Sequence, residues 1–103
     1  MSNTFTIRFE RYGGFAGMTV DKIIDSLQLE KKERELVWQM IDGSGFFSLP
    51  AEKKGKPQPD KFIYKITIQT AGKKHKVECS QTSIPDSLKE LIRYLVEKSR
   101  LRK

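Results

Sequence analysis

The alternation of apolar and polar side chains between Lys61 and Thr70 constrains the fold of this chain more than any other feature. Every second position there is apolar, at Phe62, Tyr64, Ile66 and Ile68. A period of two is typical of a β-strand that buries one face. Such a strand needs neighbouring strands and a layer that covers the apolar face, so the chain must build a sheet with something packed on one side.

Two hairpins supply the other strands. Beyond Ala71-Gly72, His75, Val77 and Cys79 alternate with charged residues, which predicts a return strand after a short turn. Near the N-terminus the range 5–10 shows the same alternation, and Met18 and Val20 begin a return that we expect to end before Lys22. Four strands, all joined by antiparallel connections, are therefore predicted.

The hydrophobic period changes to that of a helix in two segments. One extends from Ser26 to Gly43, which is placed to end it, and the other begins near Pro85-Asp86. Between them we expect a tight turn with structural phenylalanines at 45–50 and an exposed loop at 51–60. Trp38 lies off the first helix's apolar stripe, and we expect it to pack. The apolar positions of the two helices are Leu29, Leu36, Val37, Met40 and Ile41, then Leu88, Leu91, Ile92 and Leu95.

These elements predict an α+β fold in the order β-β-α-β-β-α. It comprises a four-stranded antiparallel sheet made of two hairpins, with two main helices packed on one face. A chain of 103 residues is long enough for one core, so we predict a single domain over 1–103. Neither a membrane span nor a signal peptide is evident, and we expect a cytoplasmic protein.

The residues that could perform catalysis are few. His75 is the only histidine and Cys79 the only cysteine, and four residues along a strand separate them by roughly 13 Å, too far for a nucleophilic pair. We expect a surface imidazole at His75 and a buried thiol at Cys79. A lone cysteine forms no internal disulfide, and one His and one Cys make no zinc site. We therefore predict no enzyme, no metal and no cofactor.

Much of the charge behind the net +7 lies in three lysine-rich runs at 53–56, 73–76 and 98–103. Runs of this kind are usually solvated surface. As an alternative, Lys73, Lys74 and Lys76 could form a basic surface that binds nucleic acid or an acidic protein. No RRM-like aromatic signature, helix-turn-helix pattern or Cys/His finger accompanies them, so we do not expect a dedicated nucleic-acid module.

The least generic stretch joins the first two strands at 10–18. Its glycines allow positive φ angles and close approach of another backbone, so the loop is suited to presenting Phe15. A simpler interpretation is a hairpin turn whose Phe15 folds back into the core. A phosphate-binding loop is not indicated, because neither Gly-x-Gly-x-x-Gly nor Gly-Lys-Ser/Thr is present.

Four blocks of the sequence together resemble the emfourin family, small inhibitors of thermolysin-like metalloproteases such as protealysin. They occur in the family's order at 9–18, 45–50, 59–68 and 84–95, across nearly the whole chain. The resemblance implies the same α+β fold and a thermolysin-like metalloprotease as the protein partner. We expect a monomer when free.

The glycine-rich loop is our candidate for the contact with the protease. Thermolysin-like enzymes prefer a large hydrophobic residue on the primed side of the cut, which makes Phe15 the candidate anchor. The contact surface could instead lie at 51–60 or along a helix. The proposed protease-binding residues are Arg11, Tyr12, Gly13, Gly14, Phe15, Ala16, Gly17 and Met18.

Overall fold

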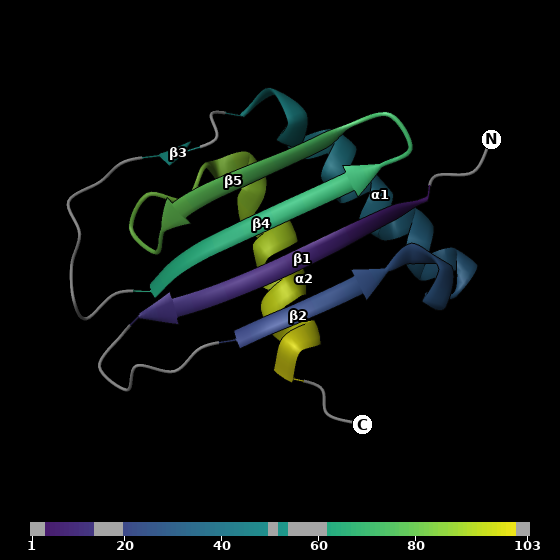
Figure 1. Ribbon diagram of the computed structural model, residues 1–103, viewed down its shortest axis with the longest axis horizontal. Coiled ribbons are helices and arrows are strands. Elements are labelled where there is room, and N and C mark those ends of the chain that lie inside the picture. The colour runs from purple at the N-terminus through teal and green to yellow at the C-terminus, as the bar shows by residue number, and fades with distance from the viewer. Residues whose placement is uncertain (1–3, 14–19, 50–51, 54–61, 101–103) are drawn as a thin grey trace.

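The computed structural model describes residues 4–13, 20–49, 52–53 and 62–100. This part of the chain forms a twisted sheet with two helices on one of its faces (Figure 1). The strands lie side by side in the order β2-β1-β4-β5-β3. The strands are β1 (Phe5–Gly13), β2 (Val20–Asp25), β3 (Glu52–Lys53), β4 (Phe62–Thr70) and β5 (Lys74–Ser80); the helices are α1 (Lys31–Ser44) and α2 (Lys89–Arg100), with single 3₁₀ turns η1 (Ser26–Gln28), η2 (Phe46–Ser48) and η3 (Asp86–Leu88).

The four longer strands pair antiparallel, as predicted, and β1 and β4 occupy the centre. The two residues of β3 are an addition, because they pair in parallel with Glu78 and Cys79 of β5. An exposed loop was expected there, and the prediction is wrong at these two residues. A strand of two residues is too short to show a hydrophobic period in the sequence. This pairing was therefore evident only from the position of these residues beside β5. The remainder of 51–60 lies outside the described residues.

The first hairpin has longer strands than the alternation indicated. β2 continues past Lys22 to Asp25, since Ile24 lies opposite Ile7 and is only 4% exposed. Burial of Ile24 on the helix-covered face extends the strand beyond the point where the sequence prediction ended it. β1 likewise continues to Gly13, which pairs with Phe62.

The core lies between the sheet and the helices. Alternate residues of the central strands are fully buried on this face, among them Ile7, Phe9, Ile66 and Ile68. From the other side, α2 and the turn before it bury Leu88, Leu91, Ile92 and Leu95, the four apolar positions predicted for this helix. Burying each large aliphatic side chain contributes about 1.5–3 kcal/mol, so this interface dominates the stability of the fold.

Helix α1 begins and ends later than the sequence indicated. Asp25 accepts a hydrogen bond from the Leu27 backbone N–H (3.0 Å), which starts the 3₁₀ turn η1 before the α-helix. The helix then continues through Gly43, and Gly45 at φ 64° ends it in the left-handed conformation. Gly43 was the wrong choice of terminator.

The side chains of α1 contribute less to the core than its apolar stripe predicted. Val37 and Ile41 are buried, whereas Leu36 is 55% exposed. Trp38 packs as expected, with its ring stacked on that of Phe5 at 6.1 Å between centroids. Phe46 of η2 is completely buried, which confirms its structural role.

A polar contact joins the two helices. Tyr94 Oη donates to Glu33 Oε2 at 2.6 Å, and Lys98 Nζ donates to the same oxygen at 2.7 Å. The hydrogen bond from Lys98, followed by that from Tyr94, lowers the pKa of Glu33. These contacts fix α1 against the C-terminal half of α2.

The two glycines of this region provide a test of where α1 ends. In Gly45→Ala, an alanine must adopt φ near 64°, which costs about 1–2 kcal/mol. In Gly43→Ala, the added Cβ meets no atom within 4 Å, and a helix-interior alanine gains about 0.5–1 kcal/mol. Urea unfolding should therefore shift the midpoint down for the first variant and up for the second. The opposite order would place the helix end at Gly43.

Candidate functional site

Gly13 and Val20, the described residues on either side of 14–19, both belong to paired strands. Phe15 and the rest of 14–18 lie outside the described residues, but Arg11, Tyr12 and Gly13 do not belong to a loop. They are the last three residues of β1, and Arg11 pairs with Val20 on one side and Tyr64 on the other. Gly13 has φ 99°, a conformation that a residue with a Cβ rarely adopts. Strand β1 thus ends in a backbone conformation that favours glycine.

Arg11 occupies the helix-covered face of this strand end. Its guanidinium carbon lies 4.6 Å from the centroid of the Phe62 ring, in the geometry of a cation–π contact. Its Nε is buried and makes no hydrogen bond to any residue that the structure describes. The aromatic ring therefore holds the arginine in place.

Tyr12 occupies the opposite face. Its hydroxyl donates to Glu78 Oε2 at 2.6 Å, a contact that spans β4 and connects β1 to β5. Lys65 Nζ lies 5.7 Å from the centroid of the Tyr12 ring. Contacts on both faces thus fix the end of β1 from which the loop departs.

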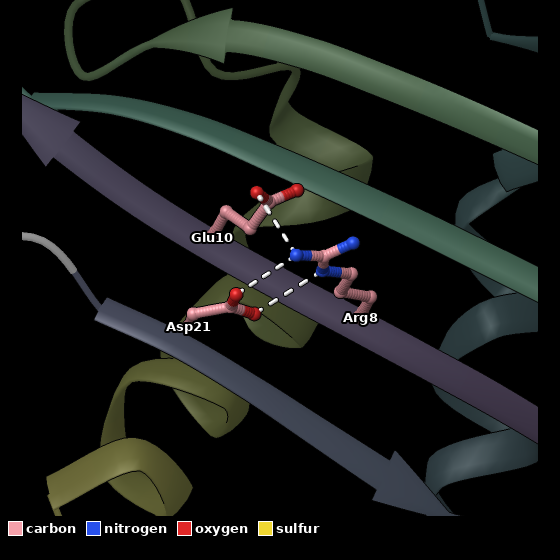
Figure 2. A network of polar contacts seen from close by, with 3 residues as sticks. All are labelled: Arg8, Glu10 and Asp21. Carbon is pink, nitrogen blue, oxygen red and sulfur yellow. Dashed lines mark hydrogen bonds and ion pairs between the residues drawn. The ribbon is translucent and has the colours of Figure 1, made fainter.

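The face of the sheet opposite the helices carries a network of charges (Figure 2). Arg8 donates two hydrogen bonds to the carboxylate of Asp21, at 2.9 and 3.2 Å, and lies 3.8 Å from Glu10. The hydrogen bond from Arg8 lowers the pKa of Asp21. Arg8 and Asp21 are about half exposed and Glu10 is 24% exposed, so these contacts shape the charge pattern of this face and contribute little to stability.

The predicted basic surface is divided by the fold. Lys74 and Lys76 project from β5 on this open face, in register with Gln69 and Thr67. Lys73 belongs to the turn before β5, and its Nζ lies 5.4 Å from the centroid of the Phe47 ring. Lys65 of β4 lies on the same face as Lys74 and Lys76. The sequence analysis missed Lys65 because only the strand register places it near them. A groove of about 640 Å³ on this face is lined by four cationic side chains, one carboxylate and five other residues: Arg8, Lys65, Lys74, Lys76, Glu10, Thr6, Ile23, Thr67, Gln69 and His75.

His75 is half-buried and is not the surface imidazole that we expected. Its Nε2 lies 2.7 Å from the carbonyl oxygen of Leu49, and its ring packs edge-on against Phe46. Because a carbonyl only accepts, this contact requires the Nε2–H form of the ring. The histidine thereby connects β5 to the turn after α1, a contact between segments far apart in the sequence.

Cys79 is a buried core residue, as predicted, and is only 1% exposed. Burial, assisted by the nearby charge of Glu78, raises the pKa of its thiol to about 11. A neutral, inaccessible thiol is a poor nucleophile. Within the described part of the chain, no three His, Cys, Asp or Glu side chains gather as a metal site would require. None of the described helices is long and apolar enough to cross a membrane.

The geometry defines an α+β scaffold that presents one end of a hairpin and one open sheet face. A sequence model of the emfourin family matches residues 9–96, and the chain therefore belongs to the emfourin family. All four blocks identified in the sequence fall within this range, and membership confirms the prediction of a non-enzymatic protein.

A solved structure shares the fold. The chain is similar to emfourin (M4in) from Serratia proteamaculans, which is described as an M4 family peptidase inhibitor. The identity is 17%, the match covers 88% of each chain, and the TM-score is 0.51. Comparison with curated proteins finds no match.

The buried thiol gives a pH-dependent test of the core. Because the folded pKa of Cys79 is raised from 9.0 to about 11, the stability linked to the neutral thiol is fully present below pH 9 and falls as the pH rises towards 11. At pH 8, dithionitrobenzoate should react with Cys79 only in denaturant. Rapid reaction of the native protein would contradict the burial of this side chain.

Proposed function

We propose that this chain inhibits an M4, thermolysin-like, zinc metalloprotease. The observation that carries the proposal is the match to the emfourin family over residues 9–96. The Serratia emfourin of the same fold is described as an M4 family peptidase inhibitor. The protein partner is thus a folded enzyme, and the chain acts by binding it as a monomer.

The inhibitory contact that we propose is made by the loop that follows β1. The loop, with Arg11–Gly13 at its base, enters the cleft, and Phe15 fills the pocket that accepts a large hydrophobic side chain. Support comes from the base of the loop, where Arg11 stacks on Phe62 and Tyr12 bonds to Glu78. A fixed base reduces the conformational entropy that is lost on binding, which favours affinity.

Inhibition is tested first by titrating the chain into a purified M4 peptidase encoded by the same organism. Hydrolysis of a peptide substrate should fall to zero at a stoichiometric amount of inhibitor, because an occluded cleft admits no substrate. A serine protease serves as the control and should keep its activity. Full M4 activity at micromolar excess of the chain would contradict the proposed function for that enzyme.

The anchor is tested by Phe15→Ala. Loss of a side chain that fills a specificity pocket costs about 2 kcal/mol or more, which corresponds to a rise of roughly 30-fold in the inhibition constant. Leu27→Ala is the matched control, because Leu27 is an apolar side chain that is 70% exposed and lies after β2, away from the loop. Equal inhibition constants for both variants would move the contact surface to 51–60 or to a helix.

A further inference from the structure

Three lysines on the open face make no ion pair with the residues that the structure describes. Lys65, Lys74 and Lys76 project from β4 and β5 on the side opposite the helices, and none pairs with an acidic group that the structure describes. Register places Lys76 opposite Thr67 and Lys74 opposite Gln69, both neutral, whereas Lys65 lies opposite Glu10 and Glu78. Unpaired cations on one surface attract an acidic partner from a distance.

The charges of this face are separated by strand. On the β1–β2 side, Arg8 lies between Asp21 and Glu10, so its charge is outweighed by two carboxylates (Figure 2). Glu78 lies directly opposite Lys65, but its carboxylate accepts the hydroxyl of Tyr12 instead. The excess of positive charge therefore lies on β4 and β5, where three lysines outnumber the single carboxylate of Glu78.

We propose that Lys65, Lys74 and Lys76 form a docking surface for an acidic region of the target M4 peptidase, next to its active-site cleft. The inference rests on the proposed function. It assigns the inhibitor a second contact, distinct from the hairpin loop, and gives the excess of positive charge a use in association.

The acidic groups on the face favour a protein over a nucleic acid. A phosphate backbone crossing the groove would approach Glu10, Asp21 and Glu78, which repel it, whereas a folded protein can place carboxylates opposite the lysines alone. The position of the groove near the hairpin favours the M4 peptidase, the partner that we propose for the loop. Lys65 lies opposite Glu10, three residues before Gly13, so this end of the groove is only about 10 Å from the base of the loop.

Charges of this kind act mainly on the rate of association. Electrostatic steering accelerates encounter by about 10- to 1,000-fold and weakens as salt is added, while dissociation depends on the close contacts of the anchor. Replacing the lysines should therefore change the association rate constant, and replacing Phe15 should change the dissociation rate constant.

The experiment compares two variants of equal charge. In the groove variant, Lys65, Lys74 and Lys76 are replaced by Gln; in the control, exposed Lys31, Lys32 and Arg93 on the helices are replaced by Gln. Stopped-flow measurement with the M4 peptidase that the wild type inhibits gives both rate constants, at low and at physiological ionic strength. Circular dichroism confirms that each variant is folded.

The groove variant should associate about tenfold more slowly at low ionic strength, lose most of its salt dependence and dissociate at the wild-type rate. The control should change association by less than about twofold. Arginine at the three groove positions should restore the rate.

Equal rates for the groove and control variants would overturn the docking surface while leaving the inhibitor intact. The docking surface would also be overturned if the groove variant associated with the protease at the wild-type rate but lost binding to a fluorescent oligothymidylate. That result would assign the groove to nucleic acid. Absence of inhibition by the wild type would overturn the proposed function itself, and the docking surface with it.

Discussion

Burial of one face of an antiparallel sheet is the constraint on which the rest of this structure depends. The core side chains Phe9 and Ile66 face each other across β1 and β4, and Ile66 in turn faces Val77 of β5. A shift of one residue between β1 and β4 would turn Arg8 or Lys65 into the core and expose their apolar neighbours. The register is therefore strongly determined, and with it the composition of the opposite face.

The two candidate contact regions follow from the same register. Because side chains alternate along β1, Arg11 reaches the helix-covered face and stacks on Phe62, while Tyr12 reaches the open face and bonds to Glu78. The end of β1 is thus held by contacts on both faces of the sheet. The groove lysines of β4 and β5 lie on the Tyr12 side, so one alternation determines both these contacts and the charged surface.

The sequence was sufficient for the features that rest on local periodicity. The strands at 5–10 and 62–70 and the buried face of α2 were predicted because each repeats one pattern over several residues. Features decided by distant contacts were not predicted. The end of β2 depends on the contact of Ile24 with Ile7, and the position of His75 depends on its hydrogen bond to the Leu49 carbonyl. The pairing of β3 depends on its place beside β5. The charged groove is a similar case: the run 73–76 suggested three adjacent lysines, yet the strand register removes Lys73 and adds Lys65.

The edges of the sheet indicate how such a scaffold binds a partner. An open edge strand offers unpaired backbone groups to another chain, and β2 and β3 are the two edges of the described sheet. Within the described residues β3 has only two, and β2 places Lys22 on the helix-covered face opposite Phe9, where pairing with a further strand would draw the charge towards the core. An inward-pointing lysine and a very short strand both discourage strand addition. The described edges therefore disfavour strand addition, which agrees with the proposal that recognition uses the hairpin and the open face.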